Sequence, residues 1–218
     1  MVTRSLHILL RIPVFVTACI LSACQSQLIT TFGYGRIPQP GGDPYDQGFV
    51  VRMPANAPSI SQRYQPYESE GKTHYGLDII GLKGSPIIAA ADGRIVHSDT
   101  SIWGNHIIID HGINEHGMLI RSEYAHLDQR LANEGVKVSR GQPIGTRGRT
   151  GLLSAGLVHL HFVVTESAAG QVPGPDSEIN PHLLWRDGPG QVSCFDESEV
   201  LPVRPLKLTY PVTCKHPE

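Results

Sequence analysis

Short apolar runs separated by glycine-centred turns dominate the chain between about residues 53 and 185. The runs are rich in β-branched residues and are shorter than typical helices, which favours strands. We expect strands at 77–80, 85–90, 93–97, 106–110, 118–125, 136–138 and 160–165. Only residues 128–134 favour a helix, and a brief one. The spacing predicts a mainly β domain with an antiparallel sheet.

The first 23 residues show the pattern of a lipoprotein signal peptide. Arg4 and Arg11 precede an apolar run at 12–21, which is shorter than the ~20 residues needed to span a bilayer. Leu21-Ser22-Ala23-Cys24 then resembles the lipobox of bacterial lipoproteins, in which Cys24 becomes the acylated first residue. An ordinary signal peptide with a chance cysteine is the alternative. Gln25 follows, which indicates outer-membrane sorting and a periplasm-facing protein if the source has two membranes.

The remaining chain divides by composition. Residues 24–52 are rich in Gly and Pro and predict a tether, 53–185 form the main domain, and 186–218 form an extension that packs on it. The extension carries Cys194 and Cys214, the pair left once Cys19 is removed and Cys24 is acylated. In an oxidising compartment we expect this pair to be disulfide-bonded, with two free buried thiols as the alternative.

Composition and charge narrow the function. With 40% hydrophobic and 17% charged residues, the chain can bury one main core. The formal net charge is −2 and the aromatic residues are scattered, so no basic stripe predicts a nucleic-acid partner. Loss of residues 1–23 would remove two arginines and no acid. Lipid, rather than attraction to an anionic surface, would therefore hold the protein at a membrane.

Eleven histidines are a surplus, and histidine is the commonest metal ligand. His159-Leu160-His161 lies in a predicted strand, where residues two apart share a face. Both imidazoles should therefore look at one site while Leu160 faces the core. A lone histidine on such a strand is more often structural, but two on one face favour a metal or catalytic role.

Two further segments add donors of the same kind. His74-Tyr75-Gly76-Leu77-Asp78 places a histidine and a carboxylate at the mouth of a strand, with a glycine that lets the backbone bend. His126 follows at the end of another strand. A carboxylate and two imidazoles suit Zn²⁺, with a fourth position left to water.

Several motifs occur together and in one order over residues 53–185. They are HYGLDI at 74–79, GSPIIAAADGRIV at 84–96, GNHIIIDHG at 104–112, YAHL at 124–127, GQPIG at 141–145, TG at 150–151 and HLHF at 159–162. In these motifs the chain resembles the lysostaphin-type (M23) zinc metallopeptidases. The fold that the resemblance implies is an antiparallel β-sheet domain, similar to the duplicated hybrid motif, with a narrow active-site groove.

The resemblance also implies roles. His74, Asp78 and His161 would be the Zn²⁺ ligands, while His126 and His159 would handle protons and the oxyanion. The implied activity is a zinc endopeptidase that hydrolyses the peptide crosslinks of peptidoglycan in the bacterial cell wall. Two departures affect the groove: the segment from Gly151 to His159 is longer than is usual in the family, and Val163 replaces a common glutamate.

Alternatives remain at this point. A degenerate member of the family would bind and activate another wall hydrolase, but such members have typically lost metal ligands. Fe(II) oxygenases also use two histidines and a carboxylate, although the extra His126 and His159 argue against them. Structural or solvated roles are expected for the other histidines within the domain, which are His97, His106, His111, His116 and His182. Tyr124 should share a strand face with His126, most simply as a packed residue.

Overall fold

A computed structural model describes residues 50–69, 72–171 and 177–214. The expected signal peptide, Cys24 and nearly all of the tether therefore lie outside the described residues. All described residues belong to one compact unit of the chain. Among them, no helix has the length and apolar character needed to cross a membrane.

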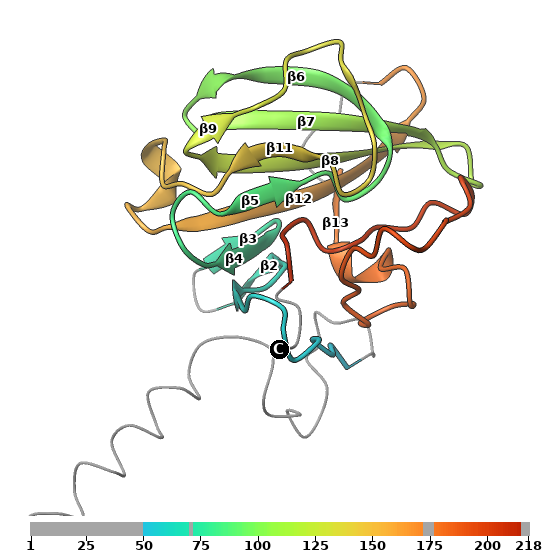
Figure 1. The fold of residues 1–218 in the computed structure, drawn as a ribbon, viewed down its shortest axis with the longest axis horizontal. Coiled ribbons are helices and arrows are strands. Elements are labelled where there is room, and N and C mark those ends of the chain that lie inside the picture. The colour runs from blue at the N-terminus through green and yellow to red at the C-terminus, as the bar shows by residue number, and fades with distance from the viewer. Residues whose placement is uncertain (1–49, 70–71, 172–176, 215–218) are drawn as a thin grey trace, which may run out of the picture. The chain divides into compact units, whose positions relative to one another are not determined.

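The large sheet carries most of the domain (Figure 1). Its hydrogen-bonded order is β1 (Ile60–Gln62), β4 (Leu77–Ile80), β12 (His159–Ala168), β8 (Met118–Leu127), β7 (Gly104–Ile113), β6 (Gly93–Ser101) and β10 (Lys137–Val138), with β13 (Glu178–Ile179) also paired to β12. Every strand pair in it is antiparallel. The predicted fold class, mainly β with antiparallel sheets, is confirmed.

Two smaller β elements complete the structure. A three-stranded antiparallel sheet has the order β5 (Pro86–Ile88), β11 (Pro143–Thr146) and β9 (Gln129–Arg130), and β2 (Gln65–Ser69) pairs with β3 (Lys72–His74). In Figure 1, β5 and β11 pass in front of β8 and β12. The described part has two 3₁₀ turns, η1 (Leu152–Ser154) and η2 (Pro181–Leu183).

The buried layer between the two sheets is built from alternate strand residues. Leu160 and Phe162 of β12 are fully buried, and Phe162 packs on Tyr124 of β8 with ring centroids 5.4 Å apart. The backbone N–H of Ala90, just after β5, donates to the Tyr124 hydroxyl at 2.9 Å. Burial raises the pKa of Tyr124 to about 12, so the hydroxyl stays neutral. Tyr124 is therefore a packed residue, as expected.

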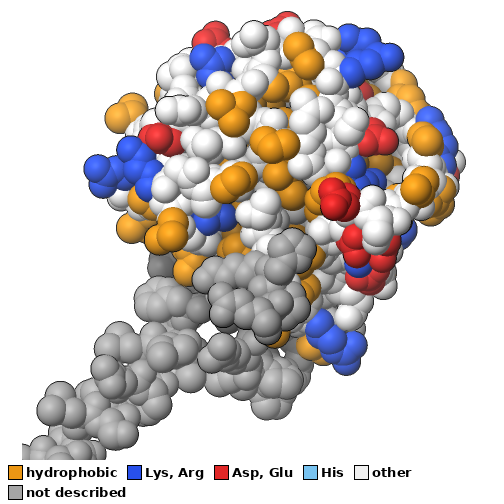
Figure 2. Space-filling model, viewed as in Figure 1, with side chains coloured by type: hydrophobic (Ala, Val, Ile, Leu, Met, Phe, Trp, Pro, Cys, Tyr) orange, Lys and Arg blue, Asp and Glu red, His pale blue; other side chains and the backbone are white. Residues whose placement is uncertain are grey.

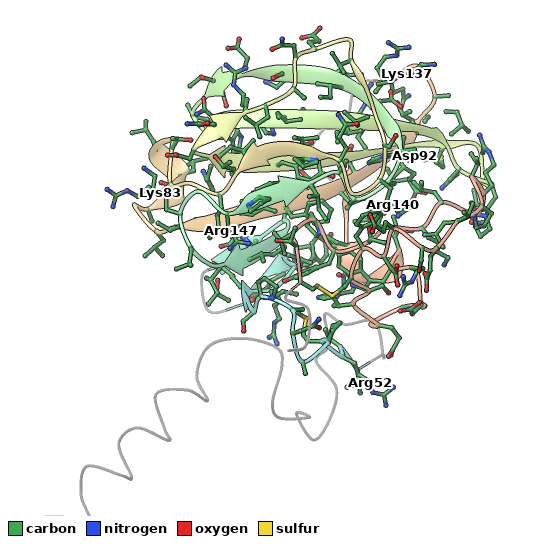
Figure 3. The ribbon with its side chains drawn as sticks, in the orientation of Figure 1. Arg52, Lys83, Asp92, Lys137, Arg140 and Arg147 are labelled. Atoms are coloured by element: carbon green, nitrogen blue, oxygen red, sulfur yellow. A yellow bond between two sulfur atoms is a disulfide. The ribbon has the colours of Figure 1, made fainter. Side chains whose placement is uncertain are left out.

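Residues 186–214 pack on the domain and supply part of its core. Leu208, Tyr210 and Val212 are buried in the main hydrophobic cluster. Arg140 fastens this segment, because its guanidinium donates to the carbonyls of Ala90 and Lys207 at 2.6 and 2.7 Å (Figure 3). Cys194 and Cys214 form a disulfide with their Cα atoms 6.0 Å apart.

Two expectations are wrong. Residues 128–134 form no helix: they contain β9 and turns, because Asp128 and Leu131 donate their backbone N–H groups to β11 rather than to a helical turn.

Tyr124 and His126 do not share a face. Residues 124–127 of β8 oppose only residues 105–107 of β7, and His126 has φ of 62°, so a bulge reverses the alternation there.

The face shown in Figure 2 carries Lys and Arg in separated groups, with polar and apolar side chains between them. Arginines and lysines on this face therefore form no continuous stripe.

Candidate active site

Regular strand alternation aims two imidazoles of β12 at one site. His159 and His161 lie on the face opposite Leu160 and Phe162, and both are buried. Asp78 of β4 is the register partner of His161, so the carboxylate and the imidazole project side by side. The strand pairing therefore fixes two donors without help from any loop.

His74 reaches the same point from the end of β3. Its Nε2 lies 3.0 Å from Asp78 Oδ1 and 3.1 Å from His161 Nδ1, while His161 Nδ1 lies 2.8 Å from Asp78 Oδ1. These three donor atoms form a nearly equilateral triangle. We call His74, Asp78 and His161 the ligand triad, and they form a group able to hold a metal ion among the described residues.

Gly76 allows the triad to close. A Cβ atom added there would lie 2.6 Å from the Phe162 carbonyl oxygen and 3.1 Å from a ring carbon of His161. Its role is therefore to let the segment between His74 and Asp78 approach β12, rather than to bend the backbone.

The electrostatics of the triad match a metal-binding protonation state. Burial alone would raise the pKa of Asp78, but its hydrogen bonds with His161 and His74 outweigh burial and hold the pKa well below its usual range. Burial lowers the pKa of His161 despite the opposing effect of Asp78. Near neutral pH the site therefore presents a carboxylate and a neutral imidazole, the forms that bind metals.

The orientation of His74 is fixed by the backbone. Its Nδ1 lies 2.7 Å from the carbonyl oxygen of Arg63, which can only accept a hydrogen bond. Nδ1 must therefore carry a proton, and Nε2 is the ring nitrogen that faces the triad. A hydrogen bond of this kind behind a ligand histidine is the usual support of a metal site.

His126 and His159 lie beside the triad, and we call them the imidazole pair. Their ring centroids are 4.8 Å apart. His159 Nε2 is 3.7 Å from Asp78 Oδ1, and the His126 ring lies 5.9 Å from the His161 ring. The structure thus brings together all five histidine and aspartate residues predicted for the site.

Both members of the imidazole pair donate Nδ1–H to backbone carbonyls. His126 bonds to Thr150 and His159 to Leu157, each at 3.0 Å. Because the carbonyls are acceptors, Nε2 of each ring is left free to accept a proton. Burial, followed by the nearby His159, lowers the pKa of His126 to about 4, so that ring is neutral near pH 7.

The other histidines of the described residues have separate environments. His97 packs edge-on against His106, and His106 lies 3.3 Å from Glu123. His111 bonds to the Asp92 carbonyl and to Ser122, His182 accepts from the indole of Trp185, and exposed His116 lies beside Glu115. None of them joins the ligand triad.

Sequence reasoning missed Trp103. Its indole is stacked on His161 with ring centroids 5.3 Å apart and planes 5° from parallel. The residue directly precedes the GNHIIIDHG motif, and that position could have drawn attention to it. Nothing in the linear sequence places it against residue 161, however.

Known proteins are similar to this chain over the segment that carries the site. The profile of peptidase family M23 matches residues 72–173. The peptidoglycan DD-endopeptidase ShyC of Vibrio cholerae is 35% identical over 135 residues, which cover 56% of this chain and 30% of that protein. The murein hydrolase activator NlpD of Escherichia coli is 44% identical over 91 residues, which cover 41% and 22%.

Lipoprotein NlpD of Yersinia enterocolitica is 42% identical over 89 residues, which cover 40% of this chain and 84% of that protein. The matched segment therefore spans most of this third relative. The segments matched in ShyC and in the Escherichia coli NlpD span less than a third of the length of those proteins.

Proposed function

Because the chain belongs to peptidase family M23, we propose that it is a zinc endopeptidase that hydrolyses the peptide crosslinks of bacterial peptidoglycan. One observation carries the proposal: three donor atoms and two additional imidazoles converge on one buried point of the sheet. A peptidase needs a Lewis acid, a proton acceptor and a group that stabilises an oxyanion. The triad and the imidazole pair could supply all three.

The triad fits zinc by donor type and by spacing. Two imidazole nitrogens and one carboxylate oxygen are a common zinc set with an open fourth position. Ligands at about 2.0 Å around a tetrahedral ion lie about 3.3 Å apart, close to the observed 2.8 to 3.1 Å. His74 Nε2, Asp78 Oδ1 and His161 Nδ1 would hold the ion. When bound, zinc supplies Lewis acidity toward the peptide carbonyl and makes water more nucleophilic at neutral pH.

The imidazole pair would move protons beside the triad. With Nδ1–H of each ring committed to a carbonyl, Nε2 of His126 and of His159 can accept a proton from water or, once protonated, donate to an oxyanion or a leaving amine. Each such function is typically worth about 10²-fold or more in rate. Either histidine fits either role.

A second function has a specific observation in its favour. The NlpD relative of Escherichia coli is named as a murein hydrolase activator, and it is 44% identical over its matched segment. An activator without catalysis has no need of the triad or of the imidazole pair, and this chain retains all five side chains. We therefore place catalysis first.

Digestion of purified, crosslinked peptidoglycan separates the two functions. An endopeptidase alone should release uncrosslinked peptides that chromatography and mass spectrometry identify, and His161→Ala should abolish them. An activator should release nothing alone, yet speed digestion by a second wall hydrolase, and His161→Ala should leave that effect intact. The second pattern would refute the endopeptidase proposal.

The proposed location is the cell envelope, with a lipid anchor at Cys24. The lipobox pattern supports it, and so does the name of the Yersinia enterocolitica relative, a lipoprotein. Cells grown with a fatty-acid analogue should label the wild-type protein and not Cys24→Ala. Label retained by the variant would place the anchor elsewhere.

A further inference from the structure

Trp103 contacts both the ligand triad and the imidazole pair. It lies in the turn between β6 and β7, where its indole stacks on His161 of the triad. Its ring also lies 6.1 Å from the ring of His126, and its backbone carbonyl accepts the His126 N–H at 3.0 Å. The indole therefore borders both groups of the site.

The indole is only partly covered by these contacts. Trp103 is 37% exposed, whereas Trp185, the other tryptophan of the chain, is fully buried in the core. Because His161 covers one face of the Trp103 ring, the exposed part is the other face or the edge. An aromatic surface left open beside a reactive site is a typical contact for an apolar ligand group.

Trp103 belongs to a larger exposed apolar cluster, which we call the apolar rim. Its other members are Ile102 (60% exposed), Leu152 (85%), Leu153 (50%) and Leu157 (66%). They come from two adjoining segments, since the Leu153 N–H donates to the Ile102 carbonyl at 3.4 Å. Exposed apolar side chains gathered in this way mark binding surfaces more often than single ones do.

Hydrogen bonds of a buried serine hold the segment that carries the three leucines in place. Ser154 is buried, and its hydroxyl bonds to the carbonyls of Arg149 and Gly151 at 2.9 Å. A Cβ atom at Gly151 would lie 2.5 Å from the carbonyl carbon of Trp103, so the segment fits closely against the β6–β7 turn. This segment, between Gly151 and His159, is the one that is longer than is usual in the family, and its leucines are exposed to solvent rather than buried.

We propose that Trp103 and the apolar rim determine specificity by packing against the aliphatic side chain of the residue next to the bond that is cut. This inference rests on the proposed function. It assigns crosslinks with an alanyl or larger aliphatic residue at that position as the substrate class, and disfavours glycyl crosslinks, because glycine has no side chain to bury on the indole. Trp103 is thus a substrate-contacting residue as well as a support for His161.

A pair of synthetic crosslinked peptides that differ only by Ala or Gly at that position gives the test. Burial of one methyl group strengthens binding by about fourfold, so kcat/KM of the wild-type enzyme should be about fourfold or more higher for the Ala peptide than for the Gly peptide. In Trp103→Ala the ratio should approach one, with a raised KM for the Ala peptide, and Trp103→Phe should keep most of the preference. Val200→Ala, which alters a residue 95% exposed on the C-terminal extension, is the matched control.

A purely structural role for Trp103 predicts a different result. In that case Trp103→Ala would lower the zinc content or the melting temperature but leave the Ala to Gly ratio of the remaining activity unchanged, which would overturn the proposal. A wild-type enzyme that cleaves both peptides equally would also overturn it.

Fluorescence gives a second measurement that does not depend on turnover. Because Trp185 is buried, the solvent-sensitive part of the emission should come from Trp103. The alanyl peptide should shift this emission to the blue and protect it from acrylamide, and Trp103→Phe should lose the response. If the chain cleaves neither peptide but the shift occurs, the proposed function fails and the rim assignment survives. If calorimetry shows that the alanyl peptide binds but the emission does not shift, the rim assignment is overturned. A dimer of the chain, detected by sedimentation, that buries Trp103 would also overturn it.

Discussion

The ligand triad and the imidazole pair are neighbours, but they are supported in different ways. Two triad members, Asp78 and His161, are register partners on adjacent strands, and the third closes the triangle from β3. The imidazole pair instead depends on carbonyls of irregular backbone, those of Thr150 and Leu157. The proposed metal binding and the proposed proton handling thus rest largely on different contacts, so it should be possible to disrupt either one and leave the other intact.

The largest effect should follow from changes to the triad. Replacing His74, Asp78 or His161 with alanine removes one of three proposed ligands, so zinc and crosslink cleavage should be lost together. Elemental analysis of each purified variant, alongside cleavage of crosslinked peptide, measures both quantities. A variant that keeps its zinc but loses activity would mean that its residue belongs with the imidazole pair.

Changes to the imidazole pair should leave the metal in place. His126→Ala and His159→Ala should lower turnover by about 10²-fold or more, with zinc near one per chain. His159 and His161 make the sharpest contrast, because they share one face of β12. If His159→Ala loses zinc while His161→Ala retains it, the two assignments are inverted.

A third change tests whether the loops support only the imidazole pair. Gly148→Ala would put a Cβ atom 2.3 Å from the Asp128 nitrogen and 2.7 Å from the His126 carbonyl oxygen, so backbone next to both histidines must shift. Turnover should fall by about tenfold or more at unchanged zinc content, in line with the sensitivity of rate to small misplacements. Gly117→Ala is a suitable control for backbone strain alone: its φ of 78° is unfavourable for a side chain, but its Cβ would meet open space. Loss of zinc in Gly148→Ala alone would show that the two supports are coupled.

The smallest effect on the site should come from the disulfide. Cys194 and Cys214 are 20 residues apart, and removal of a bridge of that span typically costs about 3 kcal/mol. Cys194→Ser with Cys214→Ser should lower the free energy of unfolding in denaturant titrations, while zinc content and activity per folded molecule stay unchanged. The intact mass of non-reduced wild-type protein should not increase with an alkylating reagent. Addition of two alkyl groups would show that the thiols are free in solution.

Alternation along strands let the sequence alone predict much of this protein. It predicted the β class, the shared face of His159 and His161, and the core position of Leu160, because side chains on a strand project with a period of two. It also supplied His74, Asp78 and His126 as candidates, by residue type and by the order of motifs. The segment at 77–80 was predicted with the bounds that the structure gives.

Tertiary structure decided what depends on contacts between distant segments. Residues 128–134 read as helical because local propensity favours a helix, yet hydrogen bonds to β11 make part of them a strand. His126 joins the site only because a bulge against β7 and a positive φ turn it away from the side of Tyr124, and no period in the sequence encodes that reversal. Trp103 lies 58 positions before His161, and only the antiparallel order of β7, β8 and β12 brings the indole onto the imidazole. Local pattern therefore determined which residues could serve, and the long-range pairing of strands determined which of them meet.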